Sequence, residues 1–178
     1  MGIFIVGDVH GCLNTFLNLL DHWDPKSETL VQVGDLVDRG VFSPSVIHLA
    51  FELQMNFKKE AHFLRGNHEQ LMINHMKGED PKGIWLSNGG GKTLRQFEVD
   101  QIDPDNYSTW LTDLPLLWEN DFVARAKALG LTVFTYTARV ETAQGEVESW
   151  FEKLVLSGVD GIFADQPDRL VQTVSRLT

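Results

Sequence analysis

The chain of 178 residues carries 25 acidic and 15 basic side chains, which gives a net charge of −10 at pH 7. This length supports one globular core, and the acidic balance argues against nucleic acids and anionic membranes as partners. No apolar run approaches the roughly 18 to 20 residues that cross a bilayer, and the start has no basic secretion signal. The single cysteine, Cys12, has no partner for an internal disulfide. These features predict a cytoplasmic protein.

The first third of the chain alternates between strand and helix patterns. Buried strands are expected at 3–6, 30–33 and up to Leu64, and helices at 13–20 and 43–57. Ser43 is predicted to cap the second helix, because Pro44 suits its first position. This β-α-β-α-β order is typical of a doubly wound α/β sheet. Ligands of such sheets bind beyond the carboxyl ends of the strands, so function is sought in the loops there.

The rest of the chain has a different pattern. A glycine-rich stretch from Gly78 to Gly91 is a candidate cap over the site, and Lys92 opens a short helical pattern. The tail is predicted to hold an alanine-rich helix ending at Gly130, a strand at 131–136, a helix at 147–155, a strand at 161–164 and a last helix after Pro167. These are again strand and helix units.

Polar side chains follow each of the three predicted N-terminal strands. The loops are 7–11 (GDVHG), 34–40 (GDLVDRG) and 65–69 (RGNHE). Their carboxylate, imidazole and amide groups suit divalent ions such as manganese, iron or zinc. Any one loop taken alone is better explained as an ordinary glycine-aspartate turn. Three such loops, each directly after a strand, favour a metal site.

The same three segments resemble the signatures of the phosphoprotein phosphatases, a branch of the calcineurin-like metallophosphoesterases. The resemblance is strongest to small bacterial and phage serine/threonine phosphatases. It extends from Met1 to about Glu119 and includes the segment WLSNGG at 85–90. It implies a metallophosphoesterase-like fold for this part of the chain and the hydrolysis of phosphomonoesters or phosphoproteins.

The resemblance also implies a set of metal ligands. Asp8 and His10 would bind one ion, Asp35 would bridge two ions, and Asn67 would bind the second. Two ions about 3.5 to 4 Å apart can activate a bridging water as hydroxide and neutralise phosphoryl oxygens during attack. The expected cofactors are therefore divalent metal ions, with manganese favoured and iron or zinc as alternatives.

Four further residues acquire roles from the resemblance. His68 would be the general acid for the leaving alkoxide, and Asp38 would orient its ring. Histidine titrates near neutral pH, and a carboxylate neighbour fixes its tautomer. Arg39 and Arg65 would hold phosphate oxygens, because the planar guanidinium matches two oxygens at once. A surface ion pair is the alternative explanation for either arginine.

The tail departs from this pattern. The phosphatase family completes its second metal site with C-terminal histidines, and this chain has no histidine after His75. From about Phe122 the tail instead resembles the end of the glycerophosphodiester phosphodiesterases, a (β/α)₈-barrel family, with Tyr136 as a candidate pocket aromatic. The sequence therefore predicts a metallophosphoesterase-like part at 1–119 and a barrel-like segment at 120–178, packed as one domain.

Three functional hypotheses remain open at this stage. The first is a protein-phosphatase-like enzyme whose second metal site is incomplete. The second is a non-catalytic or weakly active fusion that binds one divalent ion. The third, a glycerophosphodiester phosphodiesterase, rests on the tail alone. The sequence leaves open the substrate, the oligomeric state and whether the junction near residue 120 is natural or artificial.

Overall fold

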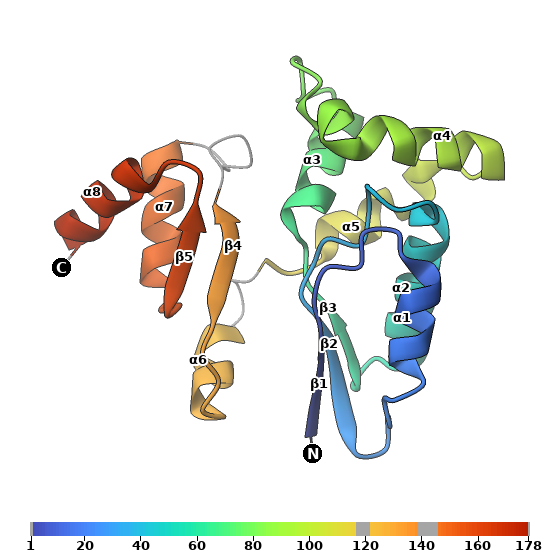
Figure 1. The fold of residues 1–178 in the computed structure, drawn as a ribbon, viewed down its shortest axis with the longest axis horizontal. Helices are drawn as coiled ribbons and strands as arrows, with labels where there is room; N and C mark the ends of the chain where they lie inside the picture. The colour runs from blue at the N-terminus through green and yellow to red at the C-terminus, as the bar shows by residue number, and fades with distance from the viewer. Residues whose placement is uncertain (1, 117–121, 139–145, 178) are drawn as a thin grey trace. The chain divides into compact units, whose positions relative to one another are not determined.

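A computed structural model describes residues 2–116, 122–138 and 146–177 (Figure 1). The chain divides into two compact units, Met1–Pro115 and Leu116–Thr178. The predicted packing of the two parts as one domain stays a prediction. Within the described residues, no helix is both long and apolar enough to cross a membrane.

The first unit is built on a parallel sheet of three strands. The strands are β1 (Gly2–Val6), β2 (Glu28–Gln32) and β3 (Ala61–Phe63), in the order β1-β2-β3. Phe4 lies opposite Leu30, and Leu30 lies opposite Ala61. The connecting helices are α1 (Leu13–Leu20) and α2 (Ser43–Asn56). The predicted β-α-β-α-β alternation is therefore present, with strand bounds shifted by one or two residues.

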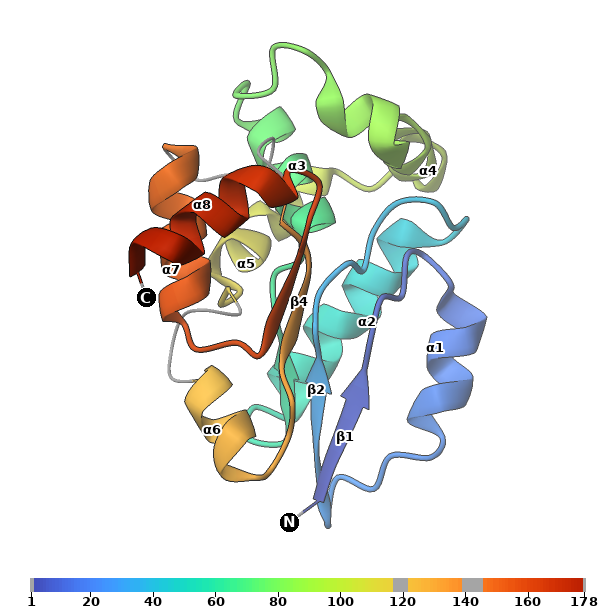
Figure 2. The ribbon, with the colours of Figure 1, turned by 60° about the vertical axis from the view of Figure 1, so that its left-hand side comes forward.

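The prediction of a doubly wound sheet is wrong for the described strands. Figure 1 and Figure 2 show α1 and α2 on the same side of the sheet. Right-handed crossovers place successive helices on one face when the strand order runs in a single direction, as it does here. A doubly wound sheet needs a reversal of strand order. On the other face, Ile3 and Ile5 remain 38% and 54% exposed.

The main hydrophobic core lies between this sheet and its helices. Phe16 of α1, Ile47 of α2 and Leu30 of β2 are at most 1% exposed and belong to one packed cluster. Each such side chain contributes about 1.5 to 3 kcal/mol relative to an exposed one. This packing holds the strands in register, and it therefore fixes where their carboxyl ends lie.

The serine predicted to cap α2 has a different role. The helix begins at Ser43 itself, and Phe42 occupies the capping position without a side-chain hydrogen bond. The hydroxyl of Ser43 instead accepts a hydrogen bond from the backbone N–H of Asp38 at 3.1 Å. The cap prediction was wrong because the loop before the helix offers Ser43 a competing donor.

The remainder of the first unit is helical. Its elements are α3 (Asn67–Met76), a π-helical turn (Leu86–Gly90), α4 (Gly91–Asp100), a 3₁₀ turn (Pro104–Tyr107) and α5 (Ser108–Asp113). The helix predicted to open near Lys92 is thus present. Trp85, directly before the π-helical turn, is fully buried in the main core.

The second unit holds a two-stranded parallel sheet. Its elements are α6 (Phe122–Ala128), β4 (Phe134–Ala138), α7 (Val147–Leu156), β5 (Gly161–Ala164) and α8 (Pro167–Leu177). Trp150, Phe151 and Leu154 of α7 pack with Leu170 of α8 in its core. The likeness of these units to the end of a barrel stays a prediction. The side chain of Tyr136 lies outside the described part.

One strand of this unit was predicted three residues too early. The apolar residues from Leu131 favoured a strand there, but β4 begins at Phe134. Val133 instead packs with Val123 and Ala126 in a small separate cluster. Its N–H donates to the Asp160 carboxylate at 2.9 Å. Val133 therefore marks a loop contact before the strand, whereas the predicted residues 134–136 do lie in β4.

Candidate metal centre and active site

The loops after β1 and β2 meet at the carboxyl edge of the first sheet. The backbone N–H groups of Val9 and His10 both donate to the carbonyl of Asp35, at 3.0 and 2.8 Å. Gly11 N–H donates to the carbonyl of Leu36 at 2.8 Å. These bonds join two loops that parallel strands already bring to one edge. The backbone therefore sets the separation of their side chains.

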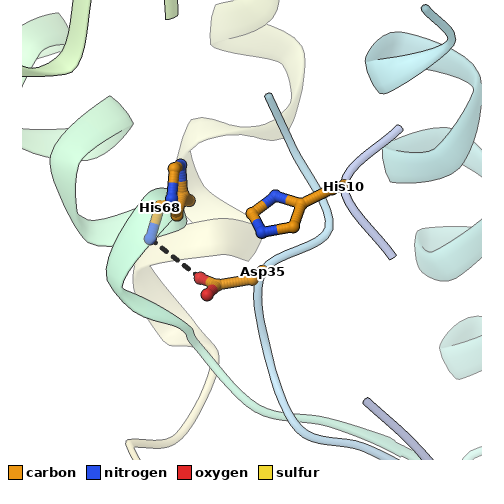
Figure 3. A group of neighbouring side chains, drawn as sticks. All are labelled: His10, Asp35 and His68. Carbon is orange, nitrogen blue, oxygen red and sulfur yellow. Dashed lines mark hydrogen bonds between the residues drawn. The ribbon is translucent and has the colours of Figure 1, made fainter. Parts of the chain in front are cut away.

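Three side chains from different loops gather at this edge. His10, Asp35 and His68 each offer a ligand atom, and these atoms lie within 4.8 Å of one another (Figure 3). The two imidazole rings are 4.7 Å apart between centroids, at 85° to each other. All three residues are at most 9% exposed. The arrangement has the size and the donor types of a divalent metal site.

His10 is oriented as a metal-binding histidine would be. Its Nδ1 lies 2.7 Å from the carbonyl oxygen of Val37, which can only accept, so Nδ1 carries the proton in the neutral ring. Nε2 is then left with a free lone pair. Among the described residues it has no hydrogen-bond partner, and its contact with Asp8 Oδ2 is long, at 3.5 Å. Ligating histidines commonly donate their other N–H to a carbonyl in this way.

The Asp35 carboxylate lies close to both imidazole rings of the group. Its Oδ1 accepts a hydrogen bond from the backbone N–H of His68 at 2.9 Å, drawn in Figure 3. Burial raises the pKa of Asp35 above the ordinary value. A cation beside this carboxylate would offset that cost, so the donor set fits a bound metal.

His68 and Asp38 form a buried pair, as the family resemblance implied. Nδ1 of His68 lies 2.7 Å from Oδ2 of Asp38, and the exposed fractions of the two side chains are 2% and 0%. The other ring nitrogen, Nε2, is 3.5 Å from the guanidinium Nη2 of Arg39. Asp38 thus holds one side of the ring, and the opposite nitrogen faces an exposed cationic side chain.

Glu69 is a site residue that the sequence analysis missed. Its buried carboxylate accepts hydrogen bonds from four backbone N–H groups, at 2.8 to 3.3 Å, which are those of Gly66, Asp35, Leu36 and Val37. It therefore ties the second loop to the third. Burial raises the pKa of Glu69 to about 7. The sequence signal for this role was its position three residues after Gly66, because a glutamate there commonly caps the start of a helix.

The backbone of the site is strained. Five described residues other than glycine have positive φ angles, and four of them belong to the site loops: His10, Asp35, Asp38 and Arg39, at 46° to 72°. The fifth, Gln101, ends α4. Residues other than glycine rarely adopt this backbone conformation, and each such residue costs on the order of 1 kcal/mol. The strain is concentrated where the side chains converge.

The other predicted site residues do not belong to this three-residue group. Asp8, half exposed at 52%, stays outside the three-residue cluster, although it lies 3.5 Å from His10. Asn67 is the half-buried first residue of α3, next to His68 in the chain. Arg65 is half-buried, and its backbone N–H donates to the carbonyl of Pro115 at 2.9 Å. The cluster thus contains two of the four predicted ligands, His10 and Asp35, together with His68, which was predicted as the acid.

Comparison with known sequences now decides the family. The sequence model of the family described as calcineurin-like phosphoesterase matches residues 1–164. The chain belongs to this family. The match includes all three site loops and continues beyond the predicted junction. The metallophosphoesterase resemblance inferred from the loops is thereby confirmed, whereas the phosphodiesterase resemblance of the tail stays a prediction.

Several known phosphoesterases are similar to this calcineurin-like protein. Serine/threonine-protein phosphatase 1 of Salmonella typhimurium is 37% identical over 90 residues, 49% of this chain and 38% of the relative. A bis(5'-nucleosyl)-tetraphosphatase, PrpE of Bacillus thuringiensis, is 33% identical over 105 residues, 53% of this chain and 41% of the relative. The chain thus spans about two fifths of the length of these relatives.

Among solved structures, a serine/threonine phosphatase from Saccharomyces cerevisiae is similar, with a TM-score of 0.37 and 26% sequence identity. The similarity covers 53% of this chain and 30% of the yeast chain. The family membership therefore rests on the sequence comparison.

The site of this calcineurin-like protein should make metal-free stability depend on pH. Burial raises the pKa values of Asp35 and Glu69, and the Asp8 carboxylate raises the pKa of His10. Each group stabilises the fold fully below its unfolded-state pKa, and this stabilisation is lost as pH rises through the folded-state pKa. Urea unfolding of metal-free protein should give a free energy higher at about pH 5.5 than at about pH 8, by on the order of 1 to 3 kcal/mol.

The carboxyls whose pKa is lowered in the fold do not disturb this comparison. Asp8, for example, has a depressed pKa because of His10, so its contribution changes only at more acidic pH. Added manganese should reverse the trend, because bound ions require deprotonated ligands. Equal stability at both pH values without metal would contradict the assigned pKa shifts.

Proposed function

We propose that the chain is a metal-dependent phosphoesterase that hydrolyses phosphomonoesters in the manner of serine/threonine phosphatases. The observation that carries the proposal is the buried group of His10, Asp35 and His68, with Asp38 held against His68. Membership of the calcineurin-like phosphoesterase family and the similarity to a bacterial protein phosphatase support it.

The proposed metal ligands are Asp8, His10, Asp35 and Asn67. His10 presents the lone pair of Nε2, while its Nδ1–H is held by the Val37 carbonyl. Asp35 offers a carboxylate whose burial favours a cationic neighbour. When bound, two divalent ions would lower the pKa of a water nucleophile and neutralise charge on the phosphoryl group.

The proposed acid is His68. With Nδ1–H donated to Asp38, a protonated ring presents Nε2–H for transfer to the leaving alkoxide. Arg39, whose guanidinium is 3.5 Å from Nε2, would orient the phosphoryl oxygens at the same point. Arg65 is proposed as a second phosphate ligand. The charge on Arg39 would also attract an anion to this point, although the whole chain is acidic.

Hydrolysis of several phosphoesters in the presence of manganese tests the proposal. The substrates are 4-nitrophenyl phosphate, a phosphoserine peptide and a dinucleoside tetraphosphate, because relatives carry protein phosphatase and tetraphosphatase names. The proposal predicts that the phosphomonoesters are hydrolysed in a metal-dependent manner. Exclusive cleavage of the tetraphosphate would assign a different substrate class, and no cleavage of any substrate would overturn the proposal.

The second metal position should be weak. No histidine follows His75, so Asp35 and Asn67 are the only ligands that the first unit is proposed to supply there. Since the proposed chemistry needs both ions, the rate should be low at micromolar manganese and rise at millimolar concentrations. A titration of manganese against 4-nitrophenyl phosphate hydrolysis measures this. Saturation at micromolar manganese would mean that groups of the tail complete the site.

The same missing histidines favour a second candidate function. The chain would then bind one divalent ion, and perform little or no catalysis, at the site of His10 and Asp35. The two candidates differ in stoichiometry: two ions per chain with turnover support the enzyme, whereas one ion without turnover supports the binding protein.

A further inference from the structure

We infer that Trp85 and Thr93 are positioning residues for the proposed acid. They lie outside the three metal-site loops, and they act on His68 through the carboxylate of Asp38. The inference rests on the proposed function for its chemical meaning. Its geometric content, that two side chains fix the Asp38–His68 pair, has a test that needs no activity.

The Asp38 carboxylate receives three side-chain donors. Oδ2 accepts from His68 Nδ1 at 2.7 Å and from Trp85 Nε1 at 2.9 Å. Oδ1 accepts from the hydroxyl of Thr93 at 2.7 Å. Because Asp38 is fully buried, these donors replace the water that would otherwise solvate it. Trp85 and Thr93 bind different oxygens, and together they fix the plane of the carboxylate.

The segment that carries these donors is shaped to bring them to Asp38. Gly90 packs directly on the indole of Trp85, where an added Cβ would overlap the ring. Gly89 has a φ of +115°, and an added Cβ there would lie 3.0 Å from the Cβ of Asp38. Both positions therefore require glycine. This explains the two adjacent glycines of the WLSNGG segment by its close approach to Asp38.

The start of the same segment is anchored independently. The carboxylate of Asp80 accepts hydrogen bonds from the backbone N–H groups of Ile84 and Trp85, at 2.7 and 3.1 Å. The ring of His75 lies beside Trp85, with centroids 5.2 Å apart. At the far end, the side chain of Lys92 donates to the carbonyl of Arg39 at 2.8 Å. The indole N–H is thus held in place from both sides.

This arrangement has a specific chemical consequence. A general acid matters most when the leaving group is a strongly basic alkoxide, and least when the leaving group is already stable as an anion. If Trp85 and Thr93 only stabilise the fold, their loss should affect all substrates alike. If they position His68, their loss should slow alkyl phosphates more than 4-nitrophenyl phosphate.

The test compares Thr93→Val, Thr93→Ser and Trp85→Phe on both kinds of substrate. We expect Thr93→Val and Trp85→Phe to lower kcat for a phosphoserine peptide by about 10- to 100-fold, with little change for 4-nitrophenyl phosphate. Thr93→Ser keeps the hydroxyl and should recover most of the rate. Thr112→Val and Trp110→Phe are matched controls, because these side chains donate to Ser108 and Gln54 instead.

A measurement without metal or substrate tests the geometry. Imidazole ¹⁵N spectra of the metal-free protein at one pH report the tautomer of His68 and the exchange of its Nδ1 proton. We expect a slowly exchanging Nδ1–H in the parent protein and in both controls, and faster exchange in Thr93→Val and Trp85→Phe. Unchanged exchange, or equal rate losses on both substrates, would overturn the inference. If the parent protein hydrolyses nothing, the spectra alone decide it.

Discussion

Replacement of Asp35 by asparagine should abolish tight manganese binding and lower phosphoesterase turnover by about 100-fold or more. The amide keeps the shape of the side chain and an oxygen that accepts the His68 N–H, so the loop should persist. It removes the negative charge that the proposed site places at its centre. Metal counting after equilibrium dialysis, with the rate measured on the same samples, checks both effects.

A matched control for this variant is Asp100→Asn, which removes an exposed carboxylate at the end of α4. It should bind manganese as the parent protein does. If Asp35→Asn retained the parent affinity, Asp35 would not be a metal ligand, and the proposed centre would be wrong.

Replacement of His68 by asparagine should separate catalysis from metal binding. Loss of a general acid costs about 100- to 10,000-fold in rate, and the effect should be largest for alkyl phosphomonoesters. The manganese content should change little, because His68 is the proposed acid rather than a proposed ligand, and its Nε2 lies 3.5 Å from the Arg39 guanidinium. Rate and metal content measured on one preparation provide the comparison.

An equal loss of rate and metal in His68→Asn would assign His68 to the metal ligands. The structure makes this a real alternative, since His68 lies with His10 and Asp35 in the same group of candidate ligands. His22→Asn serves as the control, because His22 is exposed and lies after α1, outside the site loops.

The location of the site followed from sequence because it depends on short-range patterns. Apolar runs predicted the strands, and the polar residues after them predicted the loops at one sheet edge. Parallel pairing then brings His10 and Asp35 together without further information. The His68–Asp38 pair was expected from the family resemblance, and its hydrogen bond is present.

The parts that sequence reasoning missed depend on contacts between distant residues. Trp85 and Thr93 reach Asp38 across 47 and 55 residues, and no periodicity predicts such pairs. Ser43 was assigned to a helix cap by its local position, whereas its hydroxyl accepts a hydrogen bond from the backbone N–H of Asp38. Glu69 bonds loop backbones 32 to 34 residues away. In each case the need of a buried polar group for a hydrogen-bond partner, rather than a local sequence preference, determines the contact.

The central claim is that the three loops form a divalent metal site that supports phosphomonoester hydrolysis. Its most direct test is the number of manganese ions bound per chain at increasing free manganese, with 4-nitrophenyl phosphate hydrolysis recorded on the same samples. We expect a first ion to bind at micromolar manganese and a second at millimolar manganese, with activity following the second. The absence of any bound ion at millimolar manganese, or activity that is equal with and without metal, would contradict it.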